Sequence, residues 1–566
     1  MYICTMIRSI YRVIPSGYRG KTLFVAITIL VRALLNFIGV AMLLPVLMLI
    51  VGGDIENNQY MHHLYELLGL STHGFVSVVC GVVVCVLVLK NILNQLLYHA
   101  ERNYISQIYQ HLSRKLFVGY YQRGLGFIKR SNSAHLARDV NAVSMMFTSG
   151  VLKPIAQIVG DAILLIVMFA ALSLYSLRLA LFALLIFVPI AVLFYAVVRR
   201  KLSEVGRREN ELQRTKSRIV LETFRGYADV KIGGAMPHML NNFDLAMTEI
   251  VDVRNRQASI AMLPQAFVEI GLVIGLVAIA LWGGSSSGDL QLMFGVFAVA
   301  AIRLLPVIRN MMSAWSTLRY NSYSIDVLNN ITVDDYCEVA TTSKRMDMNS
   351  CIELRDISFR YDDAANDTIS HLSMTITKGE RVGIRGASGV GKTTLFNIIL
   401  GLYRPTSGTI VVDDVELTDA NISEWQNSVG YVSQNVFITD GSLVENIAFG
   451  IDSKDIDYNL INEVISQADL MALVDSLPDG INSRIGEFGA RLSGGQRQRI
   501  GIARALYKRC KVLMFDEATS SLDAKSESNI NSAISKLSAE NKGITIIVIA
   551  HRESSLEYCN RIITLE

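Results

Sequence analysis

The sequence lacks the cysteine patterns that build metal sites. Its 566 residues contain seven cysteines, and none of them has CxxC spacing or another spacing typical of metal ligands. Cys80 and Cys85 lie in an apolar run, where buried free thiols are expected. The cysteines therefore indicate no metal centre, and they fit a protein with a reduced cytoplasmic face.

A strong net charge and an internal repeat are also missing. The 53 Lys and Arg against 50 Asp and Glu leave a formal charge of +3, which gives no reason to expect a nucleic-acid partner. No repeat is visible, so one copy of each domain is expected. A cleavable signal is not expected either, because Arg8, Arg12, Arg19 and Lys21 precede an apolar run that is too long for one.

Long apolar runs, by contrast, are abundant before about residue 315. The mean hydropathy is +0.36, and the length suggests two to four domains. Each run is close to or above the ~20 residues that cross a ~30 Å hydrocarbon core. The sequence therefore predicts an all-α polytopic membrane domain over residues 1–325. Its six expected spans are Leu23–Ile50, Gly74–Tyr98, Ile155–Leu174, Leu177–Val198, Ala261–Trp282 and Leu290–Met312.

The loops between these runs predict the orientation. The connections 52–73 and 283–289 contain no Lys or Arg, whereas 101–154 and 199–260 are rich in both. Positive loops stay on the cytoplasmic side, so the N-terminus, both long connections and the C-terminal half should face the cytoplasm.

The long connections also have helical character. Glu101–Tyr121 and Arg199–Phe224 lack proline, and their apolar residues recur at helical spacing. We expect membrane helices that continue beyond the bilayer to turns near 124–139 and 224–234. Solvated surface helices without a coupling role are the alternative.

The chain changes character after the last apolar run. A polar stretch over 326–350 is expected to be a linker. From Cys351 onward, short β-branched runs alternate with helical segments, which predicts an α/β domain over 351–566. The expected strands are Arg381–Arg385, Thr409–Val412, Lys511–Phe515 and Ile544–Ile549.

A phosphate-binding loop follows the first of these strands. Glycines at 386, 389 and 391 let successive backbone N–H groups point at phosphate oxygens. The loop opens a helix at Lys392, whose N-terminus favours anions. Lys392 is expected to contact the β- and γ-phosphates of ATP and Thr393 to ligate Mg²⁺. Ser388 and Thr394 complete the expected nucleotide contacts within this loop.

Two carboxylates end the apolar strand Val512–Phe515. Asp516 is expected to hold Mg²⁺, and Glu517 to orient or deprotonate the attacking water. An Asp-Glu pair alone is more often a solvated turn. The apolar strand before it and the residues after it favour the catalytic interpretation.

The segment Leu492–Gln496 lies between the loop and these carboxylates. A Gly-Lys-Thr loop indicates only a nucleotide, but Ser493, Gly494, Gly495 and Gln496 in this order resemble the signature of the ATP-binding cassette (ABC) family. The resemblance covers essentially the whole chain. It implies a membrane transporter driven by ATP.

The same resemblance suggests roles for further residues. Gln434 matches the loop that reaches Mg²⁺ and senses the membrane domain, and His551 matches the histidine that touches the γ-phosphate. Tyr361 resembles the aromatic residue that stacks on adenine. Asp523 matches a loop at the subunit interface. The chain ends at Glu566, where relatives usually continue with a hairpin or tail, so the C-terminal packing is open.

The resemblance also implies a dimer. In this family the signature completes the nucleotide site of the opposite subunit, so one chain carries half of each site. With one cassette and every motif intact, a homodimer with two ATP molecules is the simplest reading. The residues around Glu487 resemble a loop typical of exporters, which favours export.

The cargo is suggested by the membrane half. Val31–Gly39, Pro45, Pro264 with Glu269, and Arg303–Pro306 look like bacterial lipid-linked oligosaccharide flippases. The segment Asn57–Leu70 resembles their short external helix, an ordinary loop helix being the alternative. Charges in the spans favour an anionic headgroup; Arg303, Arg32 and Arg309 are the candidate contacts, with ion pairs between helices as the alternative.

Several functions remain as alternatives. The leading expectation is a flippase in the bacterial inner membrane that moves an amphipathic lipid-linked oligosaccharide, with the ATPase domain in the cytoplasm. An exporter of lipid A, phospholipid or a hydrophobic drug is the runner-up. A cassette that gates a channel or regulates a partner belongs to another class, against which the intact Glu517 argues. The sugar, the lipid carrier and the route through the membrane stay open.

Overall fold

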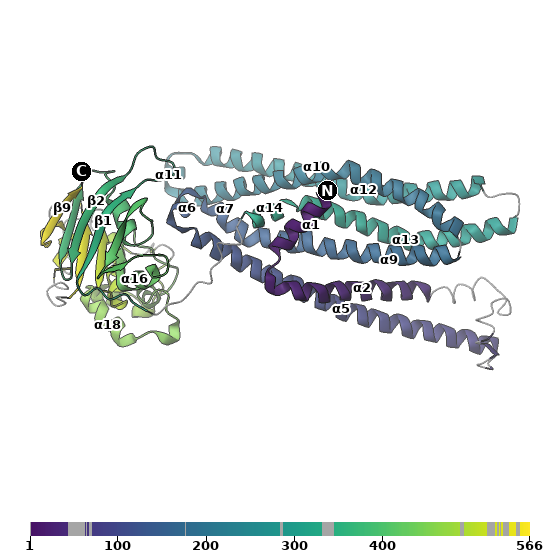
Figure 1. Ribbon diagram of the computed structural model, residues 1–566, viewed down its shortest axis with the longest axis horizontal. Coiled ribbons are helices and arrows are strands. Elements are labelled where there is room, and N and C mark those ends of the chain that lie inside the picture. The colour runs from purple at the N-terminus through teal and green to yellow at the C-terminus, as the bar shows by residue number, and fades with distance from the viewer. Residues whose placement is uncertain are drawn as a thin grey trace. The chain divides into compact units, whose positions relative to one another are not determined.

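Most of the chain can be described in the computed structural model (Figure 1). The described residues are 2–42, 63, 65–66, 69, 71–175, 177–282, 287–330, 344–486, 489, 492–517, 527–528, 531–532, 534–535, 543–550 and 555–565. Their contacts divide the chain into a helical unit, Met1–Arg123 with Phe127–Cys337, and an α/β unit, Glu338–Glu566 with the short segment Gly124–Gly126. The predicted boundaries at 325 and 350 stay predictions, and helix α14 continues to Asn329.

The helical unit is dominated by long helices. Three of them, α5, α10 and α12, have 51, 49 and 47 residues, and at 1.5 Å per residue each is about 70–77 Å long. This length exceeds the bilayer core, as expected for spans that continue beyond it. The elements are α1 (Tyr2–Val13), η1 (Ser16–Tyr18), α2 (Arg19–Ala41), α5 (Thr72–Gln122), α6 (Gly124–Arg130), α7 (Ser133–Arg138), η3 (Asp139–Val143), α8 (Ser144–Phe147), η4 (Thr148–Leu152), α9 (Lys153–Tyr175), α10 (Leu177–Arg225), α11 (Tyr227–Ile232), α12 (Met236–Trp282), α13 (Ser287–Tyr320) and α14 (Tyr323–Asn329).

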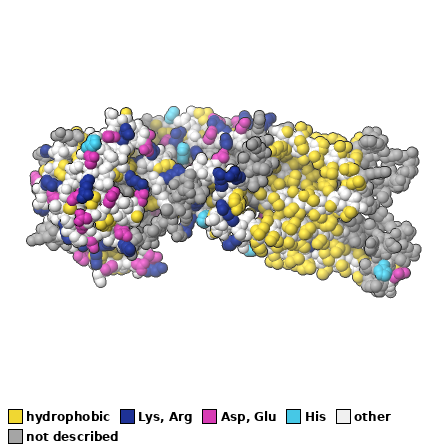
Figure 2. Space-filling view, in the orientation of Figure 1, with side chains coloured by type: hydrophobic (Ala, Val, Ile, Leu, Met, Phe, Trp, Pro, Cys, Tyr) yellow, Lys and Arg dark blue, Asp and Glu magenta, His cyan; other side chains and the backbone are white. Residues whose placement is uncertain are grey.

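Five helices in the described part of the chain are long and apolar enough to cross a membrane. They are Ser16–Gly39, Gly74–Gln122, Ser133–Leu174, Ala180–Arg225 and Met236–Val277. The sixth expected span, 290–312, is helical within α13. Figure 2 shows hydrophobic side chains over one part of this unit and Lys and Arg side chains over another. The chain is a multi-pass membrane protein with a helical membrane domain, as predicted.

The expected turns between the long helices contain short helices. α6 and α7 follow α5, and α11 lies between α10 and α12. Two π-helical turns, η3 and η4, interrupt the run that leads into α9. The buried Asp139 of η3 accepts hydrogen bonds from Arg214 of α10 at 2.8 and 3.0 Å and from the Tyr120 hydroxyl of α5 at 3.1 Å. This carboxylate joins η3 to the end of α5 and to α10, where Arg214 lies 75 residues away in the sequence.

The α/β unit contains two sheets (Figure 1). A parallel sheet has the order β6-β7-β8-β3-β9, and an antiparallel sheet the order β2-β1-β4-β5. All four predicted strands overlap strands of the structure, and the α/β class is confirmed. The strands are β1 (Cys351–Phe359), β2 (Ile369–Thr377), β3 (Arg381–Gly386), β4 (Ser407–Val412), β5 (Val415–Glu416), β6 (Val429–Val432), β7 (Val512–Asp516), β8 (Thr545–Ile549) and β9 (Arg561–Leu565).

The strands β7 and β8 of the parallel sheet are buried along their whole length, which is why their sequences are almost continuously apolar. Val512 and Met514 of β7 pack in one core with the helix α15 and the antiparallel sheet, and Leu513 and Phe515 pack in the other with α18 and α20. The strand ends therefore carry the functional side chains, since the strand interiors are committed to packing. The helices are α15 (Lys392–Ile399), α16 (Ile422–Ser428), α17 (Leu443–Ile447), η6 (Ser453–Asp455), α18 (Tyr458–Gln467), α19 (Met471–Ser476), η7 (Gly480–Asn482) and α20 (Gly494–Tyr507).

Candidate nucleotide site

The predicted phosphate loop lies between β3 and α15, in the context that the motif requires. Gly389 and Gly391 have φ of +87° and +102°, a region that residues with a Cβ rarely adopt. A Cβ on Gly391 would also lie 3.0 Å from the carbonyl oxygen of Thr368. Glycine is thus required here so that the backbone can curl around a phosphate.

Lys392 is buried at the start of α15, with its ammonium folded back over the loop. The Nζ donates to the carbonyl oxygens of Gly386 at 2.9 Å and of Ala387 at 2.8 Å. A buried ammonium needs such partners. The charge therefore stands at the centre of the loop, where phosphate oxygens could replace the two carbonyls.

The candidate Mg²⁺ ligands lie together at the end of β7. The Thr393 hydroxyl lies 3.5 Å from Oδ1 of Asp516, and the Tyr431 hydroxyl donates to Oδ2 of Asp516 at 3.3 Å. Burial raises the pKa of Tyr431, and the neighbouring Asp516 carboxylate raises it further. One carboxylate and one hydroxyl are hard oxygen donors, which suit Mg²⁺ bound together with nucleotide phosphates.

The candidate catalytic carboxylate and the candidate sensor loop are in contact. Gln434 donates from Nε2 to Oε2 of Glu517 at 3.0 Å. Glu517 has φ of +48°, and its backbone N–H donates to the carbonyl of Ile549 at 3.0 Å. A left-handed backbone is unfavourable for a residue with a Cβ, and such conformations concentrate at functional sites.

Tyr361 stands beside the phosphate loop. Its hydroxyl lies 2.8 Å from the Thr394 hydroxyl. Its ring packs edge-on against Phe359 and Tyr403, with centroids 5.0 and 5.7 Å away. A partly exposed ring held in this way offers a surface for an adenine.

The signature motif begins helix α20. Ser493 caps the helix by accepting from Gln496 N–H at 3.2 Å, while the Gln496 side chain accepts from Ser493 N–H at 2.8 Å. This capping box leaves the N–H groups of Gly494 and Gly495 at the helix N-terminus, where anions are favoured. Ser388 lies exposed in the phosphate loop.

Three predicted residues lie outside the described part of the chain. They are His551, Asp523 and Glu487. Their roles stay predictions from the resemblance. The predicted external segment 57–70 is likewise described only at isolated positions.

The candidate substrate residues of the membrane half fall into three cases. Arg32 of α2 forms an ion pair with Glu101 of α5 and lies over the ring of Tyr98. This contact matches the alternative interpretation, an ion pair between helices. Arg309 is exposed on α13. The side chain of Arg303, on the same helix, lies outside the described part.

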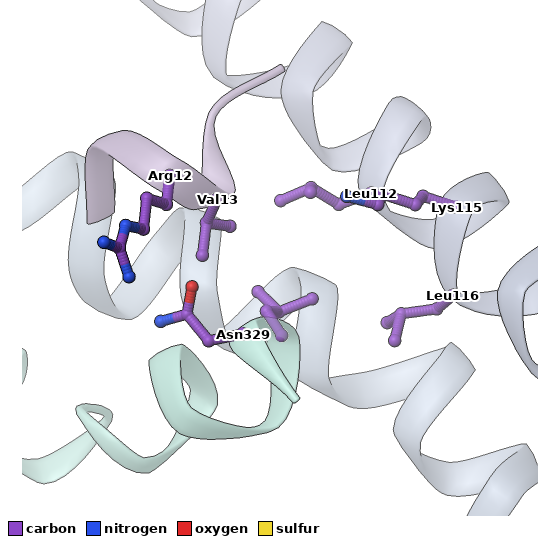
Figure 3. Close-up of a pocket in the computed structure, with 7 residues that line it drawn as sticks. Arg12, Val13, Leu112, Lys115, Leu116 and Asn329 are labelled. Carbon is purple, nitrogen blue, oxygen red and sulfur yellow. The ribbon is translucent and has the colours of Figure 1, made fainter. Parts of the chain in front are cut away.

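Arg32 belongs to a polar seam between α2 and α5. The Asn94 side chain donates to Asn36 at 2.8 Å one turn farther along, and the Thr22 and Tyr104 hydroxyls are 2.6 Å apart at the other end. A separate pocket between α1, α5 and α14 is shown in Figure 3. It is lined by Arg12, Val13, Leu112, Lys115, Leu116, Leu328 and Asn329, none of which is a predicted nucleotide contact.

Sequence reasoning missed two residues of this site. They are Tyr431, which precedes Gln434 by three residues, and Gln498 of α20. Gln498 donates from Nε2 to the carbonyl oxygen of Gln434 at 2.8 Å. The amide of Gln498 can be seen in the sequence next to the signature motif. Its hydrogen-bond partner could not be predicted, because Gln434 is 64 residues away in the sequence.

Comparisons with known proteins find matches to both parts of the chain. The ABC transporter family model matches residues 369–520, and the ABC transporter transmembrane region matches residues 24–305. A protein of Bordetella avium named ATP-dependent lipid A-core flippase is 32% identical over 71% of this chain and 68% of its own length. Proteins with the same name from Francisella tularensis subsp. holarctica and Ralstonia nicotianae are 30% and 28% identical, over 82% and 81% of this chain and 77% and 78% of theirs.

The solved structures include one with the same fold. A bacterial Atm1-family ABC exporter with ATP bound aligns with a TM-score of 0.77, covering 98% of this chain and 94% of its own at 21% identity. At that identity the similarity concerns the fold alone. It spans both the helical unit and the α/β unit.

Proposed function

Because the chain belongs to the ABC transporter family, with a transmembrane region and an ATPase domain, we propose that it is a homodimeric flippase of the bacterial inner membrane. It uses ATP to move an anionic glycolipid from the cytoplasmic to the outer leaflet. The observation that carries the proposal is that one chain contains both a complete set of ATPase motifs and a multi-pass membrane domain.

Lipid A with its core sugars is the cargo that we favour. Three relatives at 28–32% identity are named ATP-dependent lipid A-core flippases. A polyprenyl-pyrophosphate oligosaccharide is the second candidate, supported by the resemblance of Val31–Gly39 and Arg303–Pro306 to oligosaccharide flippases. Both lipids join a phosphorylated sugar head to apolar chains, and arginine binds phosphate well.

The ATPase residues divide the chemistry. Lys392 exchanges its two loop carbonyls for the β- and γ-phosphates. Thr393 and Asp516 would hold Mg²⁺, which neutralises charge that develops on the phosphates. Glu517 orients the attacking water, and the Gln434 amide holds the Glu517 carboxylate in position.

The other half of each site comes from the second subunit. Ser493 and the N-terminus of α20 would face the γ-phosphate bound to the opposite chain, which requires a dimer. ATP binding then draws the two cassettes together, and hydrolysis lets them separate. The long helices α5, α10 and α12 would carry this motion to the membrane.

The test is flipping in proteoliposomes. Vesicles are loaded with fluorescent lipid A-core or with fluorescent polyprenyl-pyrophosphate oligosaccharide, and protection of the sugar from an external modifying enzyme is followed after ATP addition. Glu517→Gln is the inactive control, with ATPase activity expected to fall at least ~100-fold.

The outcomes separate the cargoes. Movement of lipid A-core that is lost in Glu517→Gln supports the favoured cargo, and movement of only the oligosaccharide supports the second. ATP hydrolysis without movement of either lipid would contradict both cargo assignments.

A further inference from the structure

The signature helix α20 holds the loop that follows β6 by its backbone. Gln498, Gly501 and Arg504 lie on one side of α20 at spacings of three residues. Gln498 Nε2 donates to the carbonyl oxygen of Gln434 at 2.8 Å, and Arg504 Nη2 donates to that of Phe437 at 3.0 Å. The loop Ser433–Phe437 is therefore fixed to α20 at two of its carbonyl groups.

Gly501 permits this close contact. A Cβ at residue 501 would lie 2.9 Å from Cγ2 of Val436. That distance is shorter than a carbon–carbon contact allows. The loop and α20 thus pack tightly between the two hydrogen-bonded positions.

The orientation of the Gln498 amide follows from its neighbours. The side chain is 3% exposed, and Nε2 faces two carbonyl oxygens, those of Gln434 at 2.8 Å and Ser433 at 3.5 Å. A flipped amide would place Oε1 against both of these acceptors, which is unfavourable. In this orientation Oε1 is buried with no hydrogen-bond partner among the described residues.

A continuous series of contacts leads from Gln498 to the candidate catalytic carboxylate. Gln498 holds the backbone carbonyl of Gln434, whose own side chain donates to Oε2 of Glu517 at 3.0 Å. Among the described residues, the side chain of Gln498 donates to the carbonyl oxygens of Ser433 and Gln434 and makes no hydrogen bond to Glu517. Its effect on the carboxylate would pass through Gln434.

We propose that Gln498 is a positioning residue for ATP hydrolysis. It locks the loop Ser433–Phe437 to the signature helix, so that the Gln434 amide stays on the Glu517 carboxylate. The signature that faces one ATP is thereby tied to the carboxylate that acts on the other. This inference rests on the proposed roles of Gln434 and Glu517 in hydrolysis.

The unpaired oxygen distinguishes this role from a purely structural one. A buried acceptor without a partner lowers stability, while the single Nε2 bond raises it. The two effects oppose each other, so Gln498 contributes little net stability. A position chosen for stability alone would be better filled by an apolar side chain of the same length.

The test is Gln498→Met in the full-length protein. Methionine has nearly the same length and removes the donor and the unpaired oxygen together. We expect kcat for ATP hydrolysis to fall about tenfold or more, because small misplacement of a catalytic group is costly. The KM for ATP should stay within about twofold, since the phosphate loop and Tyr361 are unchanged, and the unfolding temperature should not fall.

A second variant and a control guard against misfolding. Gln498→Leu also removes the donor and puts an apolar side chain of similar volume in its place without burying a charge, so the same loss of kcat is expected. Gln467→Met on α18 removes an amide whose bond is to the exposed Glu463 side chain. It should leave kcat and KM unchanged.

The outcomes are distinguishable from failure of the proposed function. Unchanged kcat in Gln498→Met, or a loss of kcat that only accompanies a lower unfolding temperature in both variants, would overturn the positioning role. Glu517→Gln with wild-type ATPase activity would instead contradict the catalytic assignment itself.

Discussion

Tyr361 contacts both an aromatic neighbour and the helix that begins at the phosphate loop. Its ring lies against Tyr403, and its hydroxyl lies 2.8 Å from that of Thr394, next to the Mg²⁺ candidate Thr393. The resemblance to the family's adenine-stacking aromatic residue made it a candidate in the sequence. The hydroxyl contact could not be foreseen, because it depends on how β1 and α15 pack.

Replacing Tyr361 should weaken ATP binding more than hydrolysis. Tyr361→Ala removes the ring, and the loss of an aromatic stack worth ~0.5–1.5 kcal/mol predicts a KM for ATP raised about 2- to 12-fold with kcat little changed. Steady-state ATPase kinetics measure both constants. Tyr361→Trp is the control that keeps a ring, and an unchanged KM in Tyr361→Ala would argue against stacking.

At this scale the motifs indicate where side chains gather, whereas an isolated charge in a helix does not indicate its partner. Lys392, Asp516 and Glu517 were predicted because their chemistry requires fixed places around a loop and a strand end. Arg32 was predicted as a substrate contact, yet its partner Glu101 lies 69 positions away. Partners at such distances are set by helix packing, which spacing along one helix does not reveal.

Among the elements, the turn between β4 and β5 anchors the segment that enters the α/β unit. Asp413 accepts from the backbone N–H groups of Asn349, Ser350 and Cys351, the latter two at 2.7 and 2.9 Å. Burial tends to raise the pKa of Asp413, but these three bonds lower it more, and its net pKa lies below the usual value. Its carboxylate therefore stabilises the start of β1.

Asp413→Gly should destabilise the protein relative to Asp414→Gly. Both residues have positive φ, 47° and 68°, so glycine relieves the same strain at each, and the difference reports the lost bonds. We expect a difference of about 1 kcal/mol, or about 2–4 °C in unfolding temperature.

The pH dependence of that difference follows from the lowered pKa. The contribution of Asp413 is complete above the unfolded-state pKa of about 4 and is lost as the pH falls through the lower folded-state pKa. Unfolding temperatures at pH 7 and below pH 4 measure it. Equal unfolding temperatures for the two variants at pH 7 would contradict the anchoring role.

The helices α10 and α13 pack closely at Gly206. A Cβ on Gly206 of α10 would lie 1.8 Å from the carbonyl oxygen of Tyr320. Gly206→Ala should therefore destabilise the protein by about 1–3 kcal/mol through overpacking. Gly81 of α5 has nothing within 4 Å of its Cβ position, so Gly81→Ala should be neutral or stabilising by up to ~1 kcal/mol. Thermal unfolding in detergent compares the two, and a harmless Gly206→Ala would be inconsistent with this close approach.

Hydropathy predicted the membrane helices and their extensions, because burial in lipid and helical periodicity leave strong patterns. The extensions in α5 and α10 match the expected segments closely. The π-helical turns η3 and η4 had no such signal. Asp139 of η3 is held by contacts with α5 and α10, and these contacts are tertiary.

For the whole molecule, one chain carries one phosphate loop and one signature. In a dimer, each nucleotide site would combine the phosphate loop of one chain with the signature of the other. If one chain has a defective loop and its partner a defective signature, both defects fall in the same site, and the other site stays complete. Fold class and domain order were predictable from motif order. The pairing of two chains followed only from the resemblance to the family.

Mixed dimers test this arrangement. In a Glu517→Gln background, Lys392→Ala and Gly495→Asp should each abolish ATP trapping, and dimers containing one chain of each kind should trap about one ATP. Differently tagged chains are co-expressed, mixed dimers are purified, and bound nucleotide is counted. Trapping by either variant alone, or none in the mixed dimer, would contradict shared sites.

The left-handed backbone at Glu517 has one further consequence. At φ of +48° a glycine has less backbone strain than a glutamate. A glycine at this position would therefore stabilise the fold and remove the carboxylate proposed for hydrolysis. Glu517→Gly should resist heating better than the natural chain while hydrolysing nothing. Selection for durability alone would therefore remove the residue proposed to cleave ATP, and only selection for turnover retains it.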